Sequence, residues 1–254
     1  MRSGRFRRFL YLNLLLPTIA FGADELRIAV AANFVDTLNT LISAWHQTEG
    51  PKVIVSSGST GKLYAQIVNG APYDLFLAAD EQRPELLAAA GIGVAGSRFS
   101  YASGRLVLWS PTRNTINAVI GNQPPYFDLD KTRFVAVANP QLAPYGQAAK
   151  QVLESLGLWE KLRGKLVRGE NVNQAFHFVQ TGNAEVGMIA LSQLIRTQQL
   201  GSGSHWMIPA HMYDPIIQQA IIIADRPAAH DFARFMKGET AKSIIKKQGY
   251  NVPE

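Results

Sequence analysis

The sequence predicts an α/β protein with two lobes of mixed, mainly parallel sheet and flanking helices, joined by two extended hinge crossings. First, strand patterns alternate with amphipathic helix patterns three times between residues 26 and 91, which is typical of a parallel sheet with crossover helices. Second, the alternation restarts at residue 134. Third, extended stretches near residues 100–105 and 212–216 separate the two runs. This arrangement suits a clamshell that closes by hinge bending.

The first run contains three strand–helix pairs. In the first pair, apolar residues follow the i, i+3, i+4, i+7 spacing of an amphipathic helix, and Asn33 and Asp36 at its start resemble a capping box. The other two helices are each followed by a glycine, Gly70 and Gly91, as helices commonly are. Strands are predicted at residues 26–31, 53–55 and 74–78, and helices at residues 36–45, 63–68 and 84–90.

The second run follows an extended region and a loop without a clear period. The apolar segment near residue 216 is long enough to return to the first sheet. We therefore expect residues 23–104 plus 213–254 to form the first lobe and residues 105–212 the second. Further strands are predicted at residues 134–138, 185–190 and 216–223, and helices at residues 144–156 and 172–182, with two more between residues 230 and 249.

Residues 1–22 have the composition of a secretory signal peptide. Four arginines lie among the first eight residues, and the apolar run after them is shorter than the roughly 20 residues that span a bilayer. Small residues at the −3 and −1 positions predict cleavage near Gly22/Ala23. We therefore expect an exported protein.

The composition excludes several functional classes. Of the 254 residues 47% are hydrophobic and 17% charged, which is typical of a globular protein. Without residues 1–22, which hold four arginines and no acid, the formal charge falls from +6 to +2, too little for a nucleic-acid surface. The absence of cysteine excludes cysteine zinc sites, thiol catalysis and a lipid anchor on an N-terminal cysteine. We therefore expect a freely diffusing periplasmic protein.

The stretch Ser56-Ser57-Gly58-Ser59-Thr60-Gly61-Lys62 joins a predicted strand to a predicted helix. Unpaired N–H groups and the dipole at a helix start favour an anion there. A nucleotide P-loop and a serine-nucleophile elbow both require different glycine spacings. An ordinary N-cap remains the alternative to a ligand site.

Three further turns fit a ligand site. Asn33 follows the first strand, at the sheet edge where open α/β sheets bind ligands. In the second lobe, Tyr145-Gly146 and Asn171-Val172-Asn173 stand at two helix starts. The sequence therefore predicts donor-rich turns from both lobes around one cleft.

With these turns identified, the chain resembles the molybdate-binding proteins of bacterial ABC transporters, which are periplasmic binding proteins of type II topology. The resemblance implies a receptor that captures molybdate or tungstate without a cofactor, delivers it to a membrane permease and works as a monomer. The stretches that carry it are Ala31-Ala32-Asn33-Phe34, Gly58-Ser59-Thr60-Gly61, Asn69-Gly70-Ala71-Pro72-Tyr73-Asp74, Ser97-Arg98-Phe99, Gly104-Arg105-Leu106-Val107-Leu108-Trp109, Asn139-Pro140 and Lys246 to Tyr250.

The resemblance also implies the site residues. The oxyanion contacts fall on Asn33, Thr60, Tyr145 and the backbone N–H of Val172, and molybdenum is bound only as the oxyanion. Many members carry Ser or Thr in place of Asn33, and a common branch has a tyrosine in place of Ala190. This chain therefore resembles a branch in which Asn33 and Tyr145 donate those hydrogen bonds to the oxyanion instead. Possible additional contacts are Ala32, Ser59 and Asn173.

The physical chemistry of a tetrahedral dianion agrees with this site. Its oxygens only accept hydrogen bonds near neutral pH, so uncharged donors from several helix starts can hold it. A protonated oxyanion such as phosphate needs an acceptor, which such a site lacks. Lys62 is expected to remain solvated, as most lysines do.

Other functions remain open from sequence. Sulfate or a phosphonate is the nearest alternative ligand, because the size of the cavity cannot be deduced from the sequence. A hydrolase using Ser or Thr needs an oriented base, and none of the five histidines, His46, His177, His205, His211 and His230, stands in a recognisable motif. An effector domain of a transcription factor conflicts with the export signal and with the lack of a DNA-reading segment.

Overall fold

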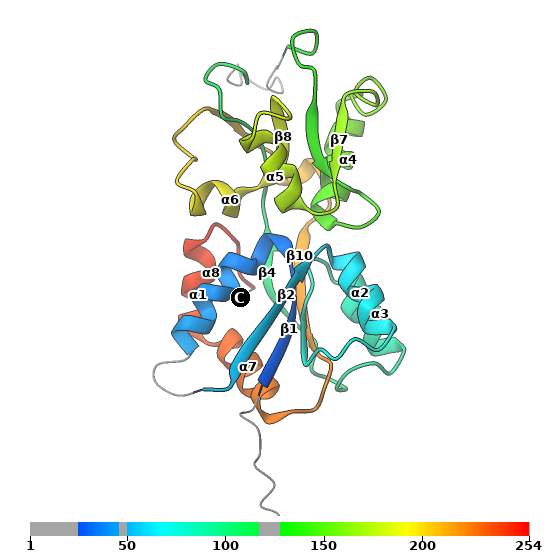
Figure 1. The fold of residues 1–254 in the computed structure, drawn as a ribbon, viewed down its shortest axis with the longest axis vertical. Helices are drawn as coiled ribbons and strands as arrows, with labels where there is room; N and C mark the ends of the chain where they lie inside the picture. Colours follow the sequence, from blue (N-terminus) through cyan, green and yellow to red (C-terminus); the bar gives the residue numbers. More distant parts are fainter. Residues whose placement is uncertain (1–24, 46–49, 117–127, 254) are drawn as a thin grey trace, which may run out of the picture.

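The computed structural model describes residues 25–45, 50–116 and 128–253. Two lobes lie one above the other along the long axis, each built on a five-stranded sheet with helices packed against it (Figure 1). The predicted signal peptide lies outside the described residues. In the part of the chain that is described, no helix has the length and apolar character to cross a membrane.

The sheet of the first lobe is mixed. β1 pairs in parallel with β2 and β3, whereas β10 runs antiparallel to β3 and β4. Ala31 and Gly58, at the ends of β1 and β2, are register partners, so the turns after both strands lie at one edge. The strand order is β2 (Lys52–Gly58), β1 (Glu25–Ala31), β3 (Leu75–Leu77), β10 (Ile216–Ile222) and β4 (Phe99–Gly104).

Helices cover both faces of this sheet because its buried residues alternate. Leu26, Ile28 and Val30 of β1 pack in one core with α1 (Val35–Trp45), α7 (Pro227–Lys237) and α8 (Glu239–Lys247). Ala29 lies in the opposite core with α2 (Thr60–Val68) and α3 (Gln82–Ala89). This period of two is that of a strand buried on both faces.

The sheet of the second lobe repeats the mixed pattern. β6 pairs in parallel with β7 and β8, and β5 runs antiparallel to β8 and β9. Helices α4 (Pro144–Ser155), α5 (Val172–Gln180) and α6 (Leu191–Arg196) pack against it. The strand order is β7 (Leu166–Gly169), β6 (Val135–Ala138), β8 (Val186–Ala190), β5 (Leu106–Ser110) and β9 (Ser204–Met207).

The chain passes between the lobes through two neighbouring strands. β4 continues through Arg105 into β5, and β10 begins shortly after the 3₁₀ helix η2 (Ala210–Met212). Gly104 and Ile216 are register partners, so the two crossings lie side by side (Figure 1). Two adjacent extended connections are the expected form of a hinge.

The predicted fold class is confirmed, with local corrections. Gly70 and Gly91 take positive φ angles of 84° and 68° just after their helices, as predicted. The capping box was wrong, because Asn33 lies inside the 3₁₀ helix η1 (Ala32–Phe34), whose N-cap is Ala31. The sequence pattern does not indicate β7 and α6, which at four and six residues are too short for a clear period.

Candidate functional site

A small pocket lies between the lobes, where the predicted donor-rich turns meet. It is nearly closed in this structure, with a cavity volume of about 10 Å³. The first lobe contributes the ends of β1 and β2 with the starts of η1 and α2, and the second lobe contributes the starts of α4 and α5. The lining residues are Ala31, Ala32, Asn33, Gly58, Ser59, Thr60, Ala79, Ala143, Pro144, Tyr145, Asn171 and Val172. Of the predicted site residues, only Asn173 is absent from this lining.

Ser59 does not act as an ordinary helix cap. It occupies the N-cap position of α2, but its side chain makes no capping hydrogen bond. Its Oγ is buried and, among the described residues, has no hydrogen-bond partner. A buried polar group without a partner costs about 1–3 kcal/mol, so this hydroxyl is available to an acceptor that enters the pocket.

Thr60 is oriented as a donor by its neighbour. Its Oγ1 accepts a hydrogen bond of 3.1 Å from the backbone N–H of Ala79. Since a hydroxyl carries one proton and the oxygen is already used as an acceptor, the proton remains available to a group in the pocket.

Tyr145 supplies the corresponding hydroxyl from the second lobe. It lies in the first turn of α4 and is buried, and its Oη has no hydrogen-bond partner in the described part of the chain. Burial raises the pKa of this hydroxyl well above its usual range, although the Gln218 side chain opposes the rise. Tyr145 therefore stays protonated near neutral pH and can donate.

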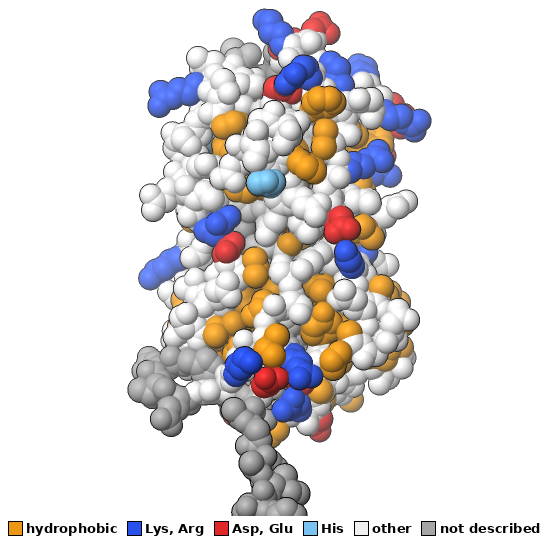
Figure 2. All heavy atoms as spheres, in the orientation of Figure 1, with side chains coloured by type: hydrophobic (Ala, Val, Ile, Leu, Met, Phe, Trp, Pro, Cys, Tyr) orange, Lys and Arg blue, Asp and Glu red, His pale blue; other side chains and the backbone are white. Residues whose placement is uncertain are grey.

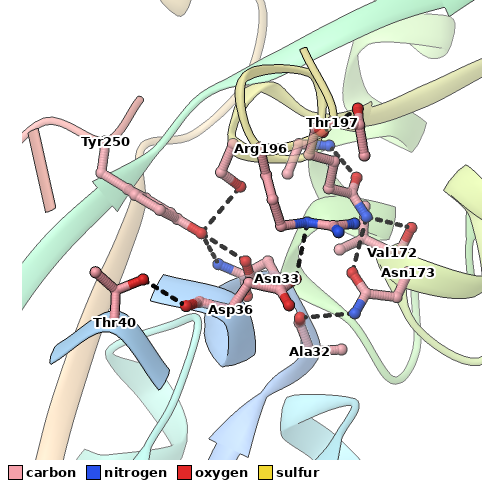
Figure 3. Close-up of polar contacts among 12 residues, drawn as sticks. Ala32, Asn33, Asp36, Thr40, Val172, Asn173, Arg196, Thr197 and Tyr250 are labelled. Carbon is pink, nitrogen blue, oxygen red and sulfur yellow. Dashed lines mark hydrogen bonds and ion pairs between the residues drawn. The ribbon is translucent and has the colours of Figure 1, made fainter. Parts of the chain in front are cut away.

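Asn33 lines the pocket, but its side-chain amide nitrogen donates to other side chains of the protein. Nδ2 donates to Oε1 of Gln218 at 3.0 Å and to the hydroxyl of Tyr250 at 3.3 Å. Tyr250 in turn donates to the carbonyl oxygen of Asn33 at 2.6 Å (Figure 3). The donor that Asn33 can offer the pocket is its backbone N–H, at a helix start where such groups have no helical acceptor.

The start of α5 leaves one amide for the pocket. Oδ1 of Asn171 caps the helix by accepting from the N–H groups of Asn173 and Gln174, at 3.0 and 3.1 Å. The N–H of Val172 is thus the first amide of the helix without a helical acceptor. Asn173 instead donates through Nδ2 to the carbonyl oxygen of Ala32, 2.9 Å away across the lobe boundary (Figure 3).

Further contacts hold the lobes together around the pocket. The N–H of Gly61 donates to the carbonyl oxygen of Leu142 at 2.9 Å. Ion pairs join Asp36 to Arg196 at 2.9 Å and Lys62 to Glu170 at 3.4 Å. Figure 2 shows charged side chains of both signs where the lobes meet, on either side of a largely uncharged strip. The half-exposed Lys62 pairs outside the pocket, in agreement with the expectation that it makes no ligand contact.

The chemistry of the pocket is that of uncharged donors. None of the described residues that line it carries a charged side chain, and no histidine is among them. His46 lies outside the described residues, and the other four stand elsewhere. Ser59 and Thr60 therefore have no neighbouring base among the described histidines, which argues against nucleophilic catalysis here.

Sequence reasoning missed the residues that support the site. Gln218 interrupts an apolar strand, and a buried polar residue in such a run is the one signal that could have singled it out. Tyr250 reaches Asn33 across 217 positions of sequence, and no local pattern indicates that contact.

Comparisons with known proteins agree with this geometry. The family described as bacterial extracellular solute-binding protein matches residues 26–251. Molybdate-binding protein ModA of Azotobacter vinelandii is 45% identical over 240 residues, which cover 93% of this chain and 94% of the relative. Molybdate-binding protein ModA of Rhodobacter capsulatus is 40% identical over 256 residues, which cover 98% and 96%.

Solved structures give the same picture. The periplasmic molybdate-binding protein of Azotobacter vinelandii aligns with a TM-score of 0.82 and 42% identity, covering 90% of this chain and 100% of that chain. The sulfate-binding protein SubI from Mycobacterium tuberculosis H37Rv aligns with a TM-score of 0.70, covering 91% and 88%. At 15% identity the second likeness concerns the fold alone.

Proposed function

The chain belongs to the bacterial extracellular solute-binding proteins, in the branch of the molybdate-binding proteins, and we propose that it captures molybdate in the pocket between its lobes. Tungstate, with the same charge and shape, is the second expected ligand. The protein is a transport receptor and not an enzyme, and molybdenum enters it only as the oxyanion. The observation that carries the proposal is one buried, unpaired hydroxyl from each lobe, Ser59 Oγ and Tyr145 Oη, at the same pocket.

The proposed binding mode uses five donors. They are the hydroxyls of Ser59, Thr60 and Tyr145 and the backbone N–H groups of Asn33 and Val172. Each hydrogen bond to a charged oxygen contributes roughly 1.5–3 kcal/mol. Burial of an unpaired dianion would cost more than any one bond returns, so all of its oxygens must be satisfied together. Ala32 lines the pocket. Asn173 makes no contact with the anion, but its side chain donates a hydrogen bond to the carbonyl oxygen of Ala32 and so links Ala32 to the second lobe.

Membership of the family supports a proposal for export, closure and delivery. We propose that residues 1–22 direct export and are cleaved near Gly22/Ala23, and that the mature protein is a periplasmic monomer. Residues 23–104 plus 213–254 and residues 105–212 then close on the anion about the two crossings. The closed receptor delivers its ligand to the membrane permease of an ABC transporter.

Calorimetry with the purified mature protein tests the ligand. Molybdate and tungstate are expected to bind tightly. Phosphate is expected to give no heat, because its proton finds no carboxylate acceptor among the described residues that line the pocket. Absence of heat with molybdate would overturn the proposal. Equal affinity for sulfate would identify a general receptor for tetrahedral dianions instead.

The affinity for molybdate is expected to stay constant between about pH 6.5 and about pH 9. The described residues that line the pocket carry no group that titrates there, and burial keeps Tyr145 protonated. Calorimetry across this range checks the prediction, and a sigmoidal loss of affinity near pH 7 would contradict it.

Alkaline pH is expected to act on stability instead. Burial raises the pKa of Tyr250 to about 12 in the folded protein, above the roughly 10 of an unfolded tyrosine. The folded state therefore holds this proton longer, and the resulting stability is complete below about pH 10 and is lost as the pH rises toward about 12.

A further inference from the structure

Gln218 is a buried polar side chain at the hinge that the proposed binding mode leaves unused. It lies on β10 and has an exposed fraction of 0%. Its Oε1 accepts from Nδ2 of Asn33 at 3.0 Å and lies 3.1 Å from the hydroxyl of Tyr101, which can also donate to it. The amide of Asn33 thus holds the acceptor end toward the first lobe, because the single proton of the Tyr101 hydroxyl is shared with the carbonyl oxygen of Ala78 at 3.0 Å. The donor end, Nε2, has no hydrogen-bond partner in the described part of the chain.

The unpaired Nε2 lies near the unpaired hydroxyl of Tyr145. Both atoms crowd against Gly104, where a β-carbon would stand 2.2 Å from Oη of Tyr145 and 3.1 Å from Nε2 of Gln218. The absence of a side chain at Gly104 therefore lets the tyrosine of the second lobe reach the amide of the first. An amide nitrogen that can donate a hydrogen bond and a hydroxyl oxygen that can accept one therefore lie close together, each without a partner among the described residues.

We propose that Gln218 is the positioning residue for Tyr145: its Nε2–H donates to Oη in the ligand-bound protein and turns the hydroxyl proton toward an oxyanion oxygen. This inference rests on the proposed function. A hydroxyl that accepts a hydrogen bond also becomes a stronger donor, since hydrogen bonds in a chain polarise one another. The chain of contacts runs from Tyr250 and Asn33 through Gln218 to Tyr145, so this ligand contact depends on both lobes.

A double-mutant cycle tests the proposal. Molybdate affinity is measured by calorimetry for the wild type, Gln218→Met, Tyr145→Phe and the double variant. We expect Gln218→Met alone to weaken binding about thirtyfold, and by only about threefold in the Tyr145→Phe background, a tenfold coupling. The proposal would be overturned if the loss of affinity in the double variant equalled the product of the losses in the two single variants. Unchanged affinity in Gln218→Met would also overturn it.

The neighbouring glutamine provides the matched control. Gln219 follows on the same strand, and its Nε2 donates to Glu81 and Ser100 outside the pocket. Gln219→Met is expected to change the affinity less than about twofold. If Gln218→Met does not fold, Gln218→Glu keeps both contacts of Oε1 and replaces the donor with an acceptor, and an affinity equal to that of the wild type would refute the positioning role.

A second measurement reads the contact directly, in protein saturated with molybdate or, where molybdate does not bind, with sulfate. In protein labelled with ¹³C at Cζ of tyrosine, the resonance of Tyr145, assigned with Tyr145→Phe, reports hydrogen bonding at Oη. Gln218→Met is expected to shift it and Gln219→Met to leave it in place, whereas an unmoved resonance in both would overturn the proposal. If molybdate fails to bind and the shift appears with sulfate, the proposed ligand is refuted and not the role of Gln218.

Discussion

A carboxylate at position 59 is expected to abolish oxyanion binding. In the variant Ser59→Asp, a group that only accepts hydrogen bonds replaces a buried donor, in a pocket whose described lining residues carry no charge. Two negative charges a few ångströms apart repel strongly where water is excluded. The affinity for molybdate measured by calorimetry should therefore fall at least about a thousandfold, or about 4 kcal/mol.

Two further variants control this result. Ser57→Asp places the same charge two positions away on an exposed part of β2 and should change the affinity less than about threefold. Ser59→Ala removes one donor without adding charge and should weaken binding about tenfold to a hundredfold. Molybdate binding by Ser59→Asp with wild-type affinity would show that the anion sits elsewhere.

Tyr145→Phe is expected to separate affinity from stability. The variant deletes a donor to the anion, so the affinity should fall about tenfold to a hundredfold. In the ligand-free protein the same change removes a buried hydroxyl without a hydrogen-bond partner among the described residues. Because such a group destabilises the folded state, the Tm without ligand should stay the same or rise.

Thermal unfolding with and without molybdate measures both effects, since a bound ligand raises the Tm by mass action. Tyr73→Phe is the matched control, because the Tyr73 hydroxyl donates to Gln66 and lies outside the pocket. It should leave the shift caused by molybdate intact. A lower Tm without ligand together with unchanged affinity would mean that Tyr145 serves packing and not binding.

The sequence predicted the fold class well because hydrophobic periodicity and the succession of strands and helices along the chain are local properties. The alternation of strand and helix patterns between residues 26 and 91 indicated a parallel sheet, and such a sheet implies a shared edge for the turns after its strands. The pairing of Ala31 with Gly58 places the turn at Asn33 beside the loop of Ser59 and Thr60. The approximate location of the site therefore followed from the chain order.

The orientation of the donors did not follow from local sequence. Ser59 fits an N-cap and a ligand site equally well, and only the missing capping bond separates the two. The amide of Asn33 is held by Gln218 and Tyr250, which lie 185 and 217 positions away. A capping box was the natural local interpretation of Asn33, and contacts at such sequence distances overrode it.

The ion pairs across the lobe boundary have a consequence for transport. They join two protein groups each, so the closed shape has some stability even when the receptor is empty. A permease that recognised only this shape would therefore also engage empty receptors and cycle without cargo. Exposed ion pairs contribute only about 0–1 kcal/mol each, far less than several hydrogen bonds to a dianion. The bound anion, and not the ion pairs between the lobes, therefore determines how often the receptor reaches the permease in the closed state.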